Sequence, residues 1–216
     1  MILKVYDTLS FMNEMKVTPD GRSTRWEKHR QEKREQLLAD TIRALRKHGA
    51  SVHMDAIADT AGTSKAVFYR HFTDRAGLWS AVVARTVEYI YRHLPLAPRP
   101  TTPLPRLVHD LAETYLTLVD KDPAVYAFVT TTPDAAIGDG ADPVVTLTAL
   151  IGERLAQLLR EHGFEQRSDI IAQAIVGAIW AVTDRWVATG QIKPKDEILA
   201  ALDELFTPYL NSETSN

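Results

Sequence analysis

The sequence contains no cysteine, which excludes a disulfide framework, a thiolate metal site and a cysteine nucleophile. No apolar run approaches the roughly 18 residues that cross a bilayer, and the first residues lack the cleavage site of a signal peptide. Glycine-rich phosphate loops, the G-x-S-x-G nucleophile elbow and the paired-histidine zinc motif are also missing. We therefore expect a cytoplasmic protein without catalytic residues, bound metal, cofactor or membrane association.

The charge of the chain is unevenly distributed. The net charge is −3 over 216 residues. Residues 22–75 contain 12 Lys and Arg against 7 Asp and Glu, a balance of +5, whereas residues 76–216 contain 11 against 18, a balance of −7. A basic segment on an acidic body is typical of a local phosphate-binding face, although a solvated charge run gives the same balance.

The hydrophobic pattern is helical, and no run with the period of a strand competes with it. The first long helix ends at Gly49 after a basic last turn. Prolines from Pro95 to Pro105 indicate a connector, and Thr132–Asp142 is predicted to be a mobile surface loop. The expected helices span residues 24–48, 54–61, 65–72, 74–93, 104–120, 122–130, 143–162, 167–189 and 194–210.

Two short helices joined by a tight turn lie between Ser51 and Trp79. Gly62 can adopt the positive φ that the turn needs, and Ala58 is small enough for the helices to cross closely. Ser64 is placed to cap the second helix through its hydroxyl group, which leaves free N–H groups at a positive helix end. In a helix-turn-helix unit this end enters the major groove of DNA.

The outer face of the second short helix carries groups suited to DNA. Lys65 and Arg70 can donate to guanine or to phosphate, and the Ala66 methyl group can meet a thymine methyl group. Tyr69 and His71 suit phosphate hydrogen bonds, although both could instead be packing aromatics. The predicted DNA contacts are Ser51, Thr63, Ser64, Lys65, Ala66, Tyr69, Arg70, His71 and Arg75.

The pattern I-A-x-x-A-G-x-S-x-x-x-x-Y-x-H-F, which begins at Ile57, resembles the TetR family of bacterial transcriptional regulators. The resemblance covers about residues 30–80. Two positions depart from the family, since Thr63 stands where an aliphatic residue is usual and Arg75 where lysine is usual. The resemblance implies an all-α homodimer that binds a double-stranded DNA operator with three N-terminal helices.

The resemblance also sets the expected domains and function. We predict a flexible N-terminal arm over residues 1–22, a three-helix helix-turn-helix domain over 23–73, and a six-helix domain for ligand binding and dimerisation over 74–216. The expected protein is a ligand-responsive regulator, most simply a repressor of a palindromic operator, with activation left open. The alternative is a DNA-binding regulator that a protein partner switches.

Two helices of the second domain are expected to form the dimer interface. The helix at 167–189 carries a stripe of small residues, Ala174, Gly177, Ala178 and Ala181, which allows a close helix approach. The resemblance implies that it pairs with the helix at 194–210 and with their copies in a four-helix bundle. Packing of both helices within one protomer is the alternative.

The interior of this domain is the expected site of the effector. Its apolar side chains and lack of a cationic cluster favour a hydrophobic or amphipathic small molecule, although most of these side chains could be ordinary core. The predicted ligand-binding residues are Leu107, Leu111, Tyr115, Phe128, Ile151, Ile179 and Trp180. Asp184 and Arg185 lie in an otherwise apolar helix, where they could anchor a ligand or a partner subunit, or form a salt bridge within or between subunits.

Overall fold

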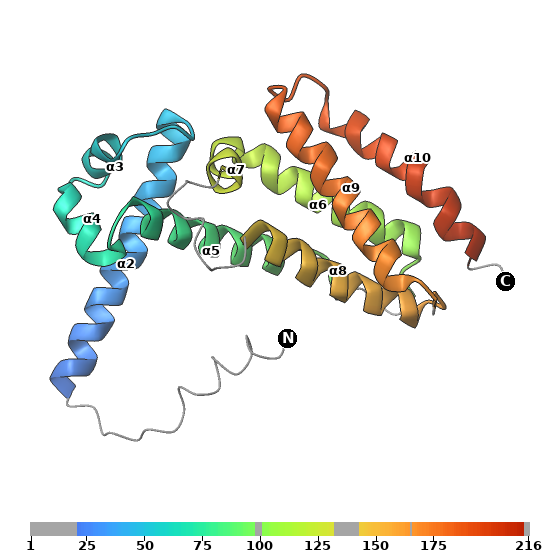
Figure 1. Ribbon diagram of the computed structural model, residues 1–216, viewed down its shortest axis with the longest axis horizontal. Coiled ribbons are helices and arrows are strands. Elements are labelled where there is room, and N and C mark those ends of the chain that lie inside the picture. The colour runs from blue at the N-terminus through green and yellow to red at the C-terminus, as the bar shows by residue number, and fades with distance from the viewer. Residues whose placement is uncertain (1–20, 98–100, 132–142, 165, 214–216) are drawn as a thin grey trace. The chain divides into compact units, whose positions relative to one another are not determined.

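The computed structural model of the chain describes residues 21–97, 101–131, 143–164 and 166–213. These residues form helices and no strand, which confirms the all-α fold (Figure 1). The helices are α2 (Gly21–His48), α3 (Met54–Thr60), α4 (Lys65–Phe72), α5 (Arg75–His93), α6 (Leu104–Lys121), α7 (Pro123–Thr130), α8 (Pro143–Glu161), α9 (Ser168–Ala188) and α10 (Lys195–Glu213).

The helix ends lie within three residues of the predicted ones. α2 begins at Gly21, so it includes the last two residues of the predicted arm, whose other residues lie outside the described part of the chain. α10 continues to Glu213 although Pro208 is inside it. Proline removes one backbone donor there without ending the helix. The loop predicted at Thr132–Asp142 lies outside the described residues.

The chain divides into two compact units, residues 1–37 and 38–216. In the first unit the described residues belong to α2, whose side chains are exposed over residues 25–32. Ion pairs one turn apart, Arg30 with Glu27 at 3.4 Å and Lys28 with Glu32 at 4.0 Å, line this segment. Such pairs stabilise an exposed helix by only a few tenths of a kcal/mol each, about 0.2–0.5.

In the second unit the short helices α3 and α4 pack on each other, and α4 packs on α5. The predicted roles of two residues in this helix crossing are confirmed: Ala58 is buried, and Gly62 has a positive φ of +61°. Ile57 and Phe68 are buried at this junction, each with no more than 2% of its surface exposed. The apolar faces of two helices too short to be stable alone are thereby removed from water.

The remaining helices share one hydrophobic core. α8 packs along α9, α6 along α10, and α5 against α8 (Figure 1). Leucine and isoleucine dominate the fully buried side chains, because helices with apolar stripes bury them against one another. The fully buried members include Leu107, Leu116, Leu155, Leu159, Ile175 and Leu210.

Helix α9 is unusual in composition. By length and apolar content it could cross a membrane, so the expectation that no segment approaches that limit does not hold for Ser168–Ala188. The core helix of a soluble protein meets the same test, and one face of α9 does lie in the core through Ala172, Ile175 and Ile179. The other face remains exposed, and only 33% of the apolar segment is buried.

Candidate nucleic-acid interface and ligand cavity

Helix α4 has one buried and one exposed face. Phe68 and Phe72 point into the protein and stack with ring centroids 6.2 Å apart. The opposite face exposes a cation, a methyl group, a phenol and a second cation, from Lys65, Ala66, Tyr69 and Arg70. A short helix held by two aromatic rings therefore presents hydrogen-bonding groups on a fixed surface, as major-groove binding requires.

The Lys65 ammonium group is not isolated. It lies 2.8 Å from the carboxylate of Asp55 on α3. This hydrogen-bonded pair raises the pKa of Lys65 and lowers the pKa of Asp55. Both side chains are largely exposed, with 47% and 75% of their surface accessible, so water screens the pair. Lys65 stays charged at neutral pH, but a negative charge lies beside it.

The other predicted DNA contacts occupy the ends of these helices. Ser64 is the N-cap of α4, as expected, but its hydroxyl forms no capping hydrogen bond, so that part of the prediction is wrong. Its carbonyl accepts from the Val67 amide at 3.0 Å instead. Thr63 and His71 are half-buried and Ser51 is exposed.

Arg75 has a structural contact within the protein. Its guanidinium donates to the Val52 carbonyl oxygen at 3.3 Å, which ties the start of α5 to the segment before α3. The side chain is nevertheless exposed. It therefore orders the backbone beside Ser51 while leaving part of the guanidinium accessible to an anion.

The junction between α4 and α5 is unusually tight. The Asp74 carboxylate accepts a hydrogen bond from the Gly77 amide at 2.7 Å and caps α5. A Cβ atom added at Gly77 would lie only 1.9 Å from the Phe72 carbonyl oxygen. Helix α5 is thus connected rigidly to the end of the exposed helix α4.

A cavity lies between α6, α8, α9 and the end of α5. The empty space in and in front of it is about 390 Å³, which includes solvent at its open side, and its wall is almost wholly apolar. Nine side chains line it: Leu94, Leu111, Tyr115, Leu147, Thr148, Ile151, Val176, Ile179 and Trp180. The apolar lining is typical of a small-molecule site.

Five of the seven predicted ligand-binding residues line this cavity, namely Leu111, Tyr115, Ile151, Ile179 and Trp180. The other two do not. Leu107 is fully buried in the core, and Phe128 is buried in α7 with its carbonyl oxygen accepting from the Trp79 indole at 3.1 Å. The predicted set did not include Leu94, Leu147, Thr148 or Val176, because hydrophobic periodicity marks buried positions without telling which of them border a cavity.

Two buried polar atoms near the cavity make no well-aligned hydrogen bond with a described residue: the Trp180 Nε1, and the Tyr126 hydroxyl, whose polar neighbours are Tyr115 and Asp184. Burial raises the pKa of Tyr115 to about 12, and it raises the pKa of Tyr126 more strongly. The carboxylate of Asp184 acts in the same direction on both phenols. Neither Asp184 nor Arg185 forms an ion pair with another described residue, so the predicted internal salt bridge is absent there, and the salt bridge between subunits stays a prediction.

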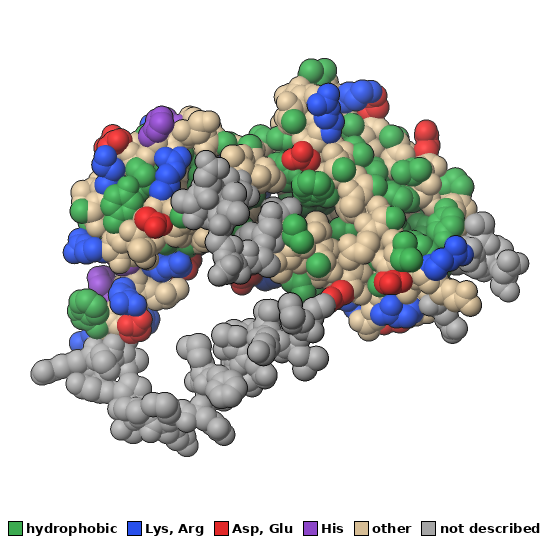
Figure 2. All heavy atoms as spheres, viewed as in Figure 1, with side chains coloured by type: hydrophobic (Ala, Val, Ile, Leu, Met, Phe, Trp, Pro, Cys, Tyr) green, Lys and Arg blue, Asp and Glu red, His purple; other side chains and the backbone are tan. Residues whose placement is uncertain are grey.

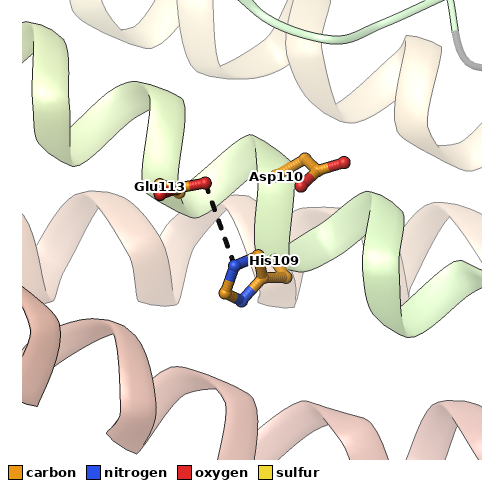
Figure 3. Close-up of side chains that lie close together, drawn as sticks. All are labelled: His109, Asp110 and Glu113. Atoms are coloured by element: carbon orange, nitrogen blue, oxygen red, sulfur yellow. Dashed lines mark ion pairs between the residues drawn. The ribbon is translucent and has the colours of Figure 1, made fainter.

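A second group of titratable side chains lies on α6. Figure 3 shows His109 and Glu113 one turn apart, with 3.9 Å between the His109 Nε2 and the carboxylate. Asp110 completes a trio whose ligand atoms lie within 4.8 Å of one another and could hold a divalent cation. Two of the three side chains already form ion pairs with other residues. Asp110 pairs with Arg106 at 2.8 Å, and the His109 Nδ1 lies 2.8 Å from the Asp203 carboxylate. This ion-pair network ties α6 to α10.

One apolar surface is left uncovered. On α9 the small residues Ala174, Gly177 and Ala181 are exposed, and a Cβ atom added at Gly177 would meet open space. On α10 Leu205 has 61% of its surface exposed. Figure 2 shows hydrophobic side chains spread over α9 and α10. An exposed apolar surface of this kind is typical of a protein interface.

The chain is similar to known regulators along most of its length. Residues 37–82 match the family of bacterial regulatory proteins, tetR family. An HTH-type transcriptional regulator of Mycobacterium tuberculosis is 30% identical over 200 residues, which are 88% of this chain and 82% of the relative. The transcriptional activator FasR of Mycolicibacterium smegmatis is 29% identical over 150 residues, 68% of either chain.

Solved structures agree with this relationship. A TetR-like transcriptional regulator from Rhodococcus sp. RHA1 is 26% identical, with a TM-score of 0.59 over 79% of this chain and 91% of that chain. The matched residues 37–82 contain the crossed helices α3 and α4 and their exposed face. This chain belongs to the TetR family of bacterial transcriptional regulators.

Proposed function

We propose that the protein is a ligand-responsive repressor that binds a palindromic operator as a homodimer and is controlled by a hydrophobic or amphipathic small molecule. The observation that carries the DNA-binding part is the exposed face of α4, on which Lys65, Tyr69 and Arg70 project while Phe68 and Phe72 anchor the helix. Ser51, Thr63, Ser64, Ala66, His71 and Arg75 complete the proposed contact surface.

The proposed function requires a dimer, because operator binding needs more contacts than one short helix provides. A single short helix makes few contacts, whereas two helices related by a twofold axis bind half-sites about one turn of DNA apart, roughly 34 Å. The uncovered apolar surface of α9 and α10 suits contact with a second copy of the chain, because the small residues on α9 allow two copies of this helix to pack closely.

Helix α5 supplies a route from ligand to DNA. It begins at the tight junction with α4 and ends just before Leu94, which lines the cavity. A ligand that prefers one position of Leu94 would move this helix and change the separation of the two DNA-contacting helices. Such coupling is typically 1–3 kcal/mol and requires different ligand affinities in the two states.

The cavity favours a small molecule over a protein partner as the switch, because a partner-switched regulator needs no apolar cavity between its helices. We propose regulation rather than catalysis, in the cytoplasm and without membrane association. The relative FasR is an activator, so the direction of regulation has a test of its own below.

The test is selection of binding sites from a random duplex library, followed by titration of the selected DNA and a scrambled duplex at two salt concentrations. We expect an inverted repeat and at least about a 10³-fold preference over scrambled DNA. Arg70→Gln should relax sequence preference and reduce the salt slope by about one. Tyr69→Phe, which removes only the hydroxyl group, should weaken binding to all sequences alike.

Arg92→Gln is the matched control, because Arg92 is an exposed cation on α5 that pairs with Glu88 at 2.9 Å. It should leave the selected sequence and the affinity unchanged. Selection of no sequence, or an equal loss of affinity in the Arg92 and Arg70 variants, would contradict the assignment of α4 as the DNA-contacting helix. A reporter gene downstream of the selected site then distinguishes repression from activation.

A further inference from the structure

We infer that the cavity binds an uncharged, mostly apolar molecule with a hydrogen-bond acceptor, such as an ester or ketone, which accepts from the Trp180 indole N–H. The inference rests on the proposed ligand-responsive function and narrows the class of effector. It excludes free carboxylic acids and hydrophobic cations as the best ligands of this site.

The first support is the Trp180 indole. Its ring lines the cavity, and its Nε1 is buried without a partner among the described residues. Indole nitrogen is only a donor, so an acceptor is the group that can satisfy it. A buried donor without a partner is unfavourable, and a ligand that supplies the missing acceptor removes this penalty on binding.

The second support is the neutrality of the wall. All nine lining side chains are uncharged. The Thr148 hydroxyl already donates to the Val145 carbonyl oxygen at 2.9 Å. Tyr115 stays protonated because burial raises the pKa of its phenol to about 12. No lining side chain can neutralise a bound carboxylate, and burying an unpaired charge is strongly unfavourable.

The third support is the charge nearest to the indole. Asp184 follows Trp180 by four residues on α9 and therefore lies on the same side of the helix. Its carboxylate is close enough to raise the pKa of both Tyr115 and Tyr126. A ligand carboxylate at the indole would meet this like charge, whereas an ester carbonyl would not.

A cationic ligand is the main competitor, because Asp184 would attract it. The unpartnered indole argues against a cation, because the Trp180 N–H can only donate and an ammonium group has no lone pair to accept it. The Trp180 N–H therefore favours a ligand with lone pairs at this wall of the cavity.

The experiment compares three probes of equal chain length, methyl decanoate, decanoate and decyltrimethylammonium, by isothermal titration of the full chain below their micelle concentrations. We expect methyl decanoate to bind and each charged probe to bind at least about tenfold more weakly. Tighter binding of decanoate or of the ammonium probe overturns the inference, and so does binding of none of the three.

Variants separate the hydrogen bond from the shape of the cavity. Trp180→Phe keeps an aromatic ring and removes the donor, so affinity for methyl decanoate should fall by roughly 2- to 12-fold. Ile179→Val is the control, because it removes one methylene from the same wall and should weaken all three probes alike. Asp184→Asn should improve decanoate binding and leave the ester unchanged.

A readout on the unaltered chain covers the case in which Trp180→Phe does not fold. Nitrogen-15 spectra resolve the indole groups of the four tryptophans, and the Trp180 N–H resonance should move downfield when methyl decanoate binds. An unmoved indole resonance with the ester bound overturns the inference. Operator affinity is measured separately, so a protein that binds operator but not the ester contradicts this inference and leaves the DNA-binding proposal standing.

Discussion

The Arg46 guanidinium and the Asp122 carboxylate form a two-contact ion pair, with Nε–Oδ1 2.5 Å and Nη2–Oδ2 2.7 Å. Arg46 is in the last turn of α2, and Asp122 lies between α6 and α7, 76 residues away. The Asp122 side chain does not cap α7, because its two oxygens are used by Arg46. The pair therefore connects the end of α2, inside the family-matched residues 37–82, to the segment between α6 and α7.

This pair should contribute measurable but modest stability. Its hydrogen bonds raise the pKa of Arg46, but half of that side chain is exposed, so water reduces the gain. In a double-mutant cycle of Arg46→Gln and Asp122→Asn, urea unfolding should give a coupling near the upper end of the surface range, about 1 kcal/mol. The coupling should shrink in 1 M salt.

The control cycle uses Arg92 and Glu88, an exposed pair within α5. Pairs at this spacing on one helix contribute about 0.3–0.5 kcal/mol. If the Arg46–Asp122 coupling is no larger than this value, the two-contact geometry does not strengthen the link between these helices.

Asp55 should act as a restraint on DNA binding. It holds the Lys65 ammonium group at 2.8 Å and adds a negative charge beside the exposed face of α4. Asp55→Asn should therefore strengthen operator binding, whereas Lys65→Gln should weaken it and reduce the salt slope by about one. Fluorescence anisotropy at several salt concentrations measures both.

Asp59→Asn provides the comparison, because Asp59 is exposed on the same helix and loses the same charge. The general electrostatic gain should appear in both variants, and the larger gain in Asp55→Asn isolates the release of Lys65. Equal gains would mean that the pair has no special effect on binding.

At the α4–α5 junction, Gly77 cannot be substituted without moving the backbone. Because an added Cβ would lie 1.9 Å from the Phe72 carbonyl oxygen, Gly77→Ala must move backbone atoms. We expect a loss of roughly 1–3 kcal/mol in the free energy of unfolding, measured with urea. Ser80→Ala, at an exposed position on the same helix α5, should instead be neutral or stabilising by up to about 0.5 kcal/mol. A tolerated Gly77→Ala would argue against a rigid junction.

Sequence patterns predicted the helices well because each helix buries a periodic face. They also selected Lys65, Ala66, Tyr69 and Arg70, which do lie on one exposed face. The spacing could not reveal the ion pair of Arg46 with Asp122, because it joins residues distant in sequence. The spacing also could not show that the Ser64 hydroxyl makes no capping hydrogen bond. The Val67 amide instead donates to the Ser64 carbonyl oxygen.

The cavity was predictable only in part for a related reason. Leu107 and Leu111 lie one turn apart on the same face of α6 and both are buried, yet only Leu111 borders the cavity. That distinction depends on how α6 and α9 fit together in three dimensions. The unpartnered indole of Trp180 depends on it as well, because the residues that surround the ring come from several helices.

The dimer surface gives the last prediction. Gly177 is exposed on α9, and a side chain there meets nothing within the protomer. Gly177→Arg should therefore leave the protomer folded, with an unchanged circular dichroism spectrum, while placing two arginines where the copies of α9 would meet. We expect sedimentation velocity to show monomers and operator affinity to fall by more than tenfold, since each half-site is then bound alone.

Gln157→Arg adds the same side chain at an exposed position on α8, where it can still pair with Glu161, so this control should remain dimeric. If Gly177→Arg stays dimeric and binds operator normally, α9 is not the interface. Leu205→Arg on α10 then distinguishes the remaining surfaces: monomers would assign dimerisation to α10 alone. A dimer unaffected by either change would place the interface outside both helices, because an arginine buried against its own copy is strongly destabilising.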